Sequence, residues 1–322
     1  MNILFLGTSS GTPTKTRNVT GIALLEETGS GWYLIDCGEG TQHQLLQTSL
    51  SLNDLQAIFI THVHGDHCYG LLGLLASAGL NGRKTPLPII APQGVEAWFN
   101  ATQQYTQLFL PFELSFVATE SLGVWQYRHL QIEAIELSHR VPSFAYSFKE
   151  THLEPSLNTE KLLQQGIPQG ALWGKLKKGF DVEYQGKTLK SSEYLYFPYQ
   201  PRHIVIAGDN DQPELLTDIC RHCHVLVHEA TYTTDVANKV GDKVGHSSAA
   251  MVATFAETIK LPHLVLTHFS ARYQQDTQQS PSIADIQQEA TEKYTGQLFI
   301  AEDFARYHLN KKGELTLSIQ QQ

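Results

Sequence analysis

Four side chains that commonly bind metal ions lie within six positions of one another in this sequence: His62, His64, Asp66 and His67. His62 and His64 are two residues apart, so in an extended chain their side chains project to the same side and can share one cation. Asp66 and His67 follow where the chain is expected to turn into a helix, and they can bind a second cation nearby. Imidazole and carboxylate together suit zinc. Gly65 is expected to supply the backbone freedom that so tight a path needs.

Three apolar segments lead directly into residues of this kind. They are 58–62, ending in His62, 204–209, ending in Asp209, and 264–268, ending in His268. A buried strand that ends in a metal-binding side chain delivers it to the rim of a sheet, where a rigid site can be built. Each segment alone is equally well explained as a strand that gives way to a polar loop. The three together predict a site at the edge of a sheet.

Strand patterns alternate with helical patterns along most of the chain. Strands are expected at 2–7, 21–27, 32–38, 57–62, 87–92, 130–139, 203–210, 225–230, 263–269 and 298–303. Helices are expected at 41–49, 95–105, 247–260 and 283–294. This order predicts an α/β (α+β) protein with layers of helix, sheet, sheet and helix.

Composition restricts the class of protein further. The chain has 322 residues, 41% of them hydrophobic, which is enough for one large α/β domain or two smaller ones. Four cysteines and a start without an export signal indicate a reducing cytoplasm, and no apolar run is long enough to predict a membrane span. The net charge of -9 argues against nucleic-acid binding over the whole surface. An RNA partner would need a local basic patch.

Such a patch occurs where the strand pattern lapses, between residues 151 and 199. From Gly166 to Lys190 there are five lysines against Asp181 and Glu183, a local charge of +3. A charge run of this kind is most simply a solvated loop. It is also the kind of segment that contacts phosphate groups.

The segment 61–67 resembles the H-x-H-x-D-H signature of the metallo-β-lactamase superfamily, and further segments resemble motifs of the ribonuclease Z family. These segments cover almost the whole chain: 5–9 with 13–18, 36–42, 138–144, 207–209, 228–231 and 267–273. The sequence departs from the family pattern at Asn210, where a threonine is expected, and at Ala171, where a proline is common. The resemblance implies a four-layer αββα sandwich spanning residues 1–322, with a protruding flexible arm inserted at 151–199.

The resemblance also implies two zinc ions per subunit, with manganese or another divalent ion as the alternative. Asp36 would orient a ligand histidine through a hydrogen bond. The implied ligands are His62, His64 and His139 for one ion and Asp66, His67 and His268 for the other, with Asp209 bridging the two.

The activity that the resemblance implies is removal of the 3′ trailer from precursor tRNA by metal-activated water, leaving a tRNA 3′-hydroxyl and a trailer 5′-phosphate. Asp66 could also accept a proton. Glu229 would orient His246, which would donate a proton to the departing ribose oxygen. Without the resemblance, His246 is a residue that merely precedes a capped helix.

Substrate binding is assigned by the same resemblance. Lys175, Lys177 and Lys178 are expected to contact tRNA phosphates, with Lys15 and Arg17 closer to the cleaved bond. In the family the arm of one subunit grips the tRNA that the other subunit cuts, so a homodimer is implied.

Other interpretations compete with this one. Another hydrolase of the same fold, such as a phosphodiesterase, thioesterase, lactonase or arylsulfatase-like enzyme, would share the metal ligands but would need no basic arm. A non-catalytic RNA-binding protein would need neither Glu229 nor His246. The segment 220–224 matches the haem-attachment spacing C-x-x-C-H. Because it runs directly into an expected buried strand, we interpret it as a helix end and a turn, with a structural zinc as the alternative.

Overall fold

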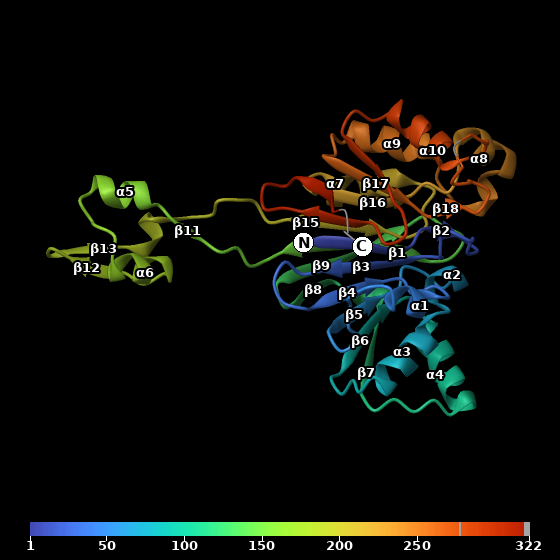
Figure 1. The fold of residues 1–322 in the computed structure, drawn as a ribbon, viewed down its shortest axis with the longest axis horizontal. Helices are drawn as coiled ribbons and strands as arrows, with labels where there is room; N and C mark the ends of the chain where they lie inside the picture. The colour runs from blue at the N-terminus through green and yellow to red at the C-terminus, as the bar shows by residue number, and fades with distance from the viewer. Residues whose placement is uncertain (277, 319–322) are drawn as a thin grey trace. The chain divides into compact units, whose positions relative to one another are not determined.

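The structure is a computed structural model that describes residues 1–276 and 278–318, and it contains two compact units (Figure 1). The larger unit combines Met1–Lys149 with the chain from Arg202 onward. The smaller unit spans Glu150–Pro201.

Two sheets form the centre of the larger unit. Among the described residues, the first sheet contains, in spatial order, β21 (Leu315–Ser318), β20 (Arg306–Leu309), β1 (Asn2–Gly7), β3 (Gly21–Leu25), β4 (Trp32–Ile35), β5 (Leu55–Phe59), β6 (Leu87–Ala91) and β7 (Leu114–Ala118). The second contains β19 (Gln297–Ile300), β17 (His263–Thr267), β16 (Val225–Glu229), β15 (His203–Ala207), β10 (Ser143–Glu150), β9 (Leu130–Leu137) and β8 (Val124–Tyr127). A short parallel pair, β2 (Ser9–Ser10) with β18 (Phe269–Ser270), joins segments from the two ends of the chain.

Helices follow the strands of both sheets. The N-terminal half contributes α1 (Thr41–Leu45), α2 (Gly65–Cys68), α3 (Leu71–Leu80), α4 (Val95–Thr106) and the 3-10 turn η1 (Thr119–Ser121). The C-terminal half contributes η3 (Pro213–Leu216), α7 (Thr217–Cys220), α8 (Thr234–Val240), η4 (Asp242–Val244), α9 (Ala249–Thr258) and α10 (Ile283–Thr291).

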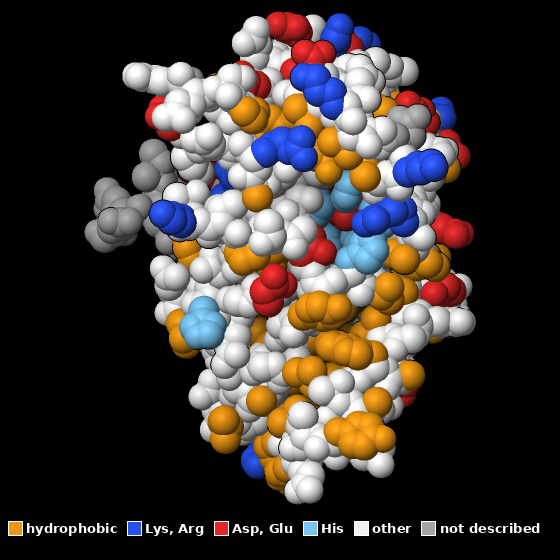
Figure 2. All heavy atoms as spheres, turned by 90° about the vertical axis from the view of Figure 1, so that its right-hand side faces the viewer, with side chains coloured by type: hydrophobic (Ala, Val, Ile, Leu, Met, Phe, Trp, Pro, Cys, Tyr) orange, Lys and Arg blue, Asp and Glu red, His pale blue; other side chains and the backbone are white. Residues whose placement is uncertain are grey.

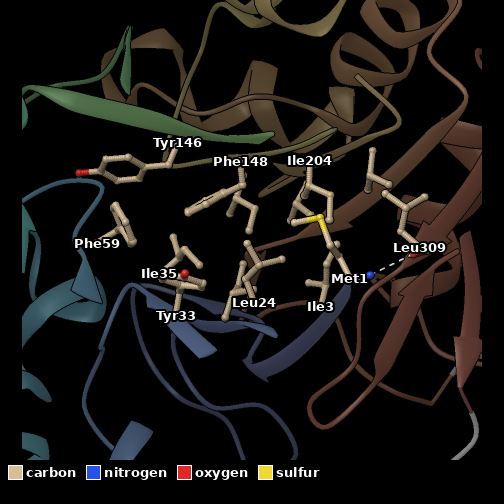
Figure 3. Close-up of a cluster of buried hydrophobic side chains, with 14 of the residues drawn as sticks. Met1, Ile3, Leu24, Tyr33, Ile35, Phe59, Tyr146, Phe148, Ile204 and Leu309 are labelled. Atoms are coloured by element: carbon tan, nitrogen blue, oxygen red, sulfur yellow. Dashed lines mark hydrogen bonds between the residues drawn. The ribbon is translucent and has the colours of Figure 1, made fainter. Parts of the chain in front are cut away.

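The alternation of side chains along each strand produces the layers. In β1, Ile3 and Phe5 point between the two sheets, whereas Leu4 and Leu6 belong to the cluster that includes α3 and α4. Residues of β16 divide in the same way between the inter-sheet core and the cluster with α9 and α10. Figure 3 shows the inter-sheet core, where Tyr33 of β4 and Phe148 of β10 approach from opposite sheets. The predicted αββα sandwich is confirmed.

The predicted elements are found, with differences at their ends and some omissions. The strand predicted at 57–62 ends at Phe59, and the helix predicted at 41–49 ends at Leu45. The predictions omit β10, whose first six residues are all buried, because a central strand lacks polar alternation. They also omit α3, an apolar helix with four buried residues.

The smaller unit has its own secondary structure. It contains α5 (Thr159–Gln164), α6 (Ala171–Lys177), η2 (Ser191–Glu193), the pair β11 (Ser156–Leu157) with β14 (Leu195–Tyr196), and the pair β12 (Val182–Tyr184) with β13 (Lys187–Leu189). These elements enclose a small apolar cluster that includes Leu162, Leu176 and Tyr194. The interpretation of this region as a plain solvated loop was therefore wrong, because apolar residues spaced among the glycines and lysines supply a core.

Among the described residues, no helix combines the length and the apolar character needed to cross a membrane.

Candidate metal centre

Several candidate ligands, and Asp36 that supports one of them, lie just beyond the carboxyl ends of strands in both sheets. Asp36 follows β4 and His62 follows β5, and these two strands are parallel neighbours. In the second sheet, Asp209 follows β15 and His268 follows β17, with β16 parallel between them. His139 follows the antiparallel strand β9. Parallel neighbours end at the same edge of their sheet, so residues far apart in the sequence meet at one edge of the sandwich.

Three imidazoles and one carboxylate oxygen form the first group. His64 Nδ1 lies 3.0 Å from His62 Nε2 and 3.2 Å from His139 Nε2. Asp209 Oδ2 lies 3.5 Å from His62 Nε2 and 3.8 Å from His139 Nε2. All four ligand atoms lie within 4.8 Å of one another.

The second group contains Asp66, His67 and His268. The Nε2 atoms of the two histidines are 3.2 Å apart, and Asp66 Oδ2 lies 3.5 Å from His67 Nε2 and 3.4 Å from His268 Nε2. The other oxygen of Asp209, Oδ1, lies 3.5 Å from His67 Nε2 and 3.3 Å from His268 Nε2. Asp209 thus presents one carboxylate oxygen to each group.

These spacings fit divalent cations. Ligand nitrogens about 2.0–2.1 Å from a tetrahedral ion lie roughly 3.4 Å apart, which is close to the separations in both groups. Burial lowers the pKa values of His62, His64 and His139, together with repulsion from neighbouring imidazoles. These three side chains are therefore neutral at pH 7, and a metal ligand must be a neutral imidazole.

Hydrogen bonds fix the orientation of the imidazoles. His67 Nδ1 lies 2.7 Å from Asp36 Oδ2, so this nitrogen carries a proton and Nε2 is directed at the ligand groups. Burial opposes the protonation of His67, but Asp209, Asp36 and Asp66 outweigh it and raise its pKa, so an ion bound at Nε2 would have to displace a proton. Asp36 also accepts hydrogen bonds from the backbone N–H of Thr61 at 2.7 Å and from its hydroxyl at 2.8 Å. His139 Nδ1 donates to the carbonyl oxygen of Gly245 at 2.6 Å.

Two residues of this network adopt a left-handed backbone conformation. Asp36 has φ 60° and His268 has φ 58°. A non-glycine residue in this region costs of order 1–3 kcal/mol, and it persists only where the surrounding structure compensates. Strain of this kind clusters at functional sites.

The buried Glu229 pairs with the partly buried His246 beside the ligand groups. Glu229 Oε1 lies 3.0 Å from His246 Nδ1, and Asp209 Oδ2 lies 3.7 Å from the same nitrogen. Burial opposes the protonation of His246, but Glu229 and Asp209 outweigh it and raise its pKa to about 9. Although Asp209, His246 and His268 could also be grouped as ligands, the Nδ1 of His246 is occupied by Glu229. His246 is therefore suited to hold and donate a proton.

Gly65 is required for a reason other than the predicted backbone freedom, and that prediction was wrong. Its φ is not positive; it begins α2 as an ordinary helical residue. A Cβ at this position would overlap the ring of Tyr69, which packs directly on the Gly65 backbone. The glycine is needed for close approach.

The residues predicted to contact the substrate differ in their exposure to solvent. Lys15, Lys175, Lys177 and Lys178 are exposed. Arg17 is only 3% exposed, and its Nη2 donates to the carbonyl oxygen of Tyr273 at 2.5 Å. The structure therefore corrects the role predicted for Arg17: it joins its loop to the segment after β18 and is not accessible to RNA.

Two residues that hydrogen-bond to site residues or to the predicted motif segments were not predicted individually from the sequence. Thr231 places its hydroxyl 3.0 Å from His268 Nδ1 and also hydrogen-bonds Glu229. Asp303 accepts hydrogen bonds from the Thr8 hydroxyl and from the Asn18 backbone N–H, both at 2.7 Å. Thr231 lies inside the segment 228–231, so its position in a motif was a usable signal. Asp303 lies in none of the motif segments, although it ends the strand predicted at 298–303.

The sandwich with a histidine–aspartate cluster at one edge defines the class of protein. A solved structure described as the metallo-β-lactamase fold protein YhfI from Bacillus subtilis superposes with a TM-score of 0.64 at 16% identity, covering 95% of this chain and 98% of that chain. This likeness establishes the metallo-β-lactamase fold. Residues 1–149 also match a family model described as anti-Pycsar protein Apyc1.

Relatives over the full length identify the family. A protein of Pseudomonas putida (strain GB-1) named Ribonuclease Z is 52% identical over 313 residues, 97% of this chain and 98% of that protein. The solved structure of human tRNase Z, short form, has a TM-score of 0.64 at 26% identity and covers 96% of this chain and 100% of that chain. The chain belongs to the ribonuclease Z family of endoribonucleases.

Proposed function

We propose that this protein is a zinc-dependent endoribonuclease that removes the 3′ trailer from precursor tRNA, leaving a 3′-hydroxyl on the tRNA and a 5′-phosphate on the trailer. The observation that carries the proposal is the pair of ligand groups that share Asp209, in a chain of the ribonuclease Z family. The names of the relatives, Ribonuclease Z and tRNase Z, support tRNA as the substrate.

Seven side chains would hold the ions: His62, His64 and His139 on one side, Asp66, His67 and His268 on the other, and Asp209 between them. When bound, two divalent ions would neutralise phosphate charge and lower the pKa of a water molecule toward 7. Asp36 keeps Nε2 of His67 directed at the site. Asp66 Oδ2 accepts the Gly11 backbone N–H at 2.7 Å and faces His67 and His268, so this oxygen is placed as a metal ligand. Burial opposes ionisation of Asp66, but His67 and His268 outweigh it and hold the pKa of this carboxyl well below its usual range, which argues against the proton-accepting role predicted for Asp66.

His246 would protonate the departing ribose oxygen. With Nδ1 engaged by Glu229, the opposite ring nitrogen is the one that can donate to the substrate. Glu229 in turn is buried and holds the imidazolium in place. The Thr231 hydroxyl hydrogen-bonds Glu229 and also contacts His268 Nδ1. Thr231 therefore helps to position both the partner of the proton donor and a metal ligand.

The Glu150–Pro201 unit would bind the body of the tRNA. Its exposed Lys175, Lys177 and Lys178 lie in or directly after α6, whose Leu176 is buried in the unit's core. Phosphate contacts of this kind position a folded RNA without reading its sequence. A homodimer, in which this unit of one subunit grips the tRNA cut by the other, and a cytoplasmic location belong to the same proposal.

Product analysis tests the chemistry. Purified protein of measured metal content is incubated with end-labelled precursor tRNA, with and without a chelator. The proposal expects a 3′-hydroxyl on the tRNA, a 5′-phosphate on the trailer and loss of cleavage with the chelator. A 2′,3′-cyclic phosphate would reject it, because that product requires attack by the RNA's own 2′-hydroxyl. Faster turnover of small esters than of precursor tRNA would favour another hydrolase of the same fold.

A further inference from the structure

A mostly apolar cavity of about 240 Å³, within the larger unit, shares the segment 62–69 with the metal-ligand groups. Its walls come from the segment 63–69 and from the start of α4. The lining residues are Val63, Cys68, Tyr69, Gly94, Val95 and Trp98. Figure 2 shows the face concerned: histidine side chains gather near its centre, and hydrophobic side chains extend below them.

The cavity is continuous with the catalytic segment of the chain. Val63 stands between the ligands His62 and His64, and Cys68 directly follows the ligand His67. The Cys68 thiol donates to the carbonyl oxygen of Val63 at 3.5 Å, which closes the wall. The segment 62–69 therefore supplies both metal ligands and part of the cavity lining.

The aromatic ring at the mouth of the cavity is held in position. Tyr69 is 62% exposed, yet its ring packs against the Gly65 backbone and lies 6.2 Å from the Trp98 ring, with 33° between the planes. The exposed Tyr69 ring therefore has the Gly65 backbone on one side and the Trp98 ring on the other. It presents a preformed apolar surface one helical turn from the ligands.

The side chains that line the cavity are suited to bind a flat, uncharged group. None of the six lining residues carries a charged side chain, and all but Gly94 contribute an aliphatic, aromatic or thiol side chain to the cavity wall. Aromatic side chains bind unpaired nucleobases by stacking, without regard to their identity. Cavities for drug-sized ligands measure about 300–1,000 Å³, so this smaller volume suits one ring system rather than a whole nucleotide.

The direction of the RNA chain across the site indicates which nucleotide would lie at the cavity. His246, which lies before α9 on the side of the second sheet, would protonate the 3′ oxygen of the upstream ribose. The cavity instead lies between the segment 63–69 and α4, on the side of the first sheet. The nucleotide on the other side of the cleaved bond therefore extends toward the cavity.

We propose that Val63, Tyr69 and Trp98 form a stacking subsite for the nucleobase of the first trailer nucleotide, a proposal that rests on the proposed function. The subsite is tolerant of base identity, and it positions the scissile phosphate by holding the nucleotide that follows it.

The test compares metal-loaded enzyme on two precursor tRNAs that differ at the first trailer nucleotide, which carries either its natural base or no base. Stacking on an aromatic side chain predicts a roughly 5- to 100-fold lower kcat/KM on the abasic substrate. Tyr69→Ala and Trp98→Ala should lose a similar factor on the natural substrate and should no longer distinguish the two. Tyr69→Phe, which keeps the ring, should behave as the wild type.

The matched control is Tyr105→Ala, an 86% exposed aromatic residue in the last turn of the same helix α4, which should retain full sensitivity to the missing base. Equal cleavage of both substrates by the wild type would overturn the subsite while leaving the proposed function intact. Undiminished sensitivity of Tyr69→Ala and Trp98→Ala to the missing base would overturn the assignment of these side chains to the subsite. No cleavage of the intact precursor by the wild type would overturn the proposed function itself, and the subsite with it.

Discussion

The edge of the sandwich that carries the ligand groups and the Glu150–Pro201 unit are built in opposite ways. At the edge, His62, His67, Asp209 and His268 are each at most 3% exposed, and they are set by further hydrogen bonds. In the smaller unit, the candidate substrate residues are exposed lysines around a small core. The difference follows from the tasks proposed for them. Holding ions requires fixed ligand positions, whereas attracting a phosphate backbone requires charge within reach.

The largest effect is expected at the residue shared by both ligand groups. Asp209→Asn should lower the bound metal to well below two ions per chain and reduce RNA cleavage by several orders of magnitude, because each oxygen faces a different group. Metal analysis together with cleavage rates checks this. Asp218→Asn, at an exposed position of α7, is the control and should change neither. Full metal content in Asp209→Asn would contradict the bridging role.

The next effect is expected at His246. His246→Asn should lower kcat by roughly 10²- to 10⁴-fold, the usual contribution of a positioned general acid, without loss of metal. An RNA whose departing 3′ oxygen is replaced by sulfur needs no protonation, so the variant should cut that substrate nearly as fast as the wild type. The exposed His43→Asn is the control. Failure of the sulfur substrate to restore cleavage would remove His246 from the proton-donor role.

Changes to the lysines of the smaller unit should alter the salt dependence of tRNA binding and leave the catalytic step unchanged. Replacing Lys175, Lys177 and Lys178 together with alanine should weaken precursor tRNA binding and make the slope of log K against log salt shallower by about 2–3, at 0.7–0.9 for each lost phosphate contact. Hydrolysis of a small phosphodiester should be unchanged. The triple replacement of the exposed Lys84, Lys260 and Lys293 in the larger unit is the control. An equal loss on both substrates would mean that the lysines act on the catalytic site.

The smallest effect is expected at Arg17. Because it is buried, Arg17→Gln should lower the melting temperature by a few degrees, about 2–4 °C for each kcal/mol lost in a domain of 150–250 residues. The salt slope of tRNA binding should stay the same, whereas exposed Lys15→Gln in the same loop should make it shallower. A shallower slope for Arg17→Gln would restore the predicted RNA contact.

Much of the fold could be predicted because strand and helix periodicity is local. The strand at 2–7 and the beginnings of the helices at 41, 95 and 283 agree with the structure. Strand β10 was omitted because burial on both faces removes the polar alternation on which the prediction relies. The smaller unit was misjudged for the opposite reason: its few core residues, such as Leu176, are dispersed among glycines and lysines.

By itself, the sequence determined which side chains could carry the chemistry, because ligand types and their spacing in segments such as 62–67 are local properties. It did not determine which histidine Asp36 orients, that Arg17 is buried, or that the Tyr69 ring rests on Gly65 beside Trp98. Those facts were decided only by the tertiary structure, since each depends on contacts between segments that lie on different strands, helices or loops. The type of a residue limits the chemical roles that it can have. Its tertiary contacts determine which of those roles it has in the folded protein.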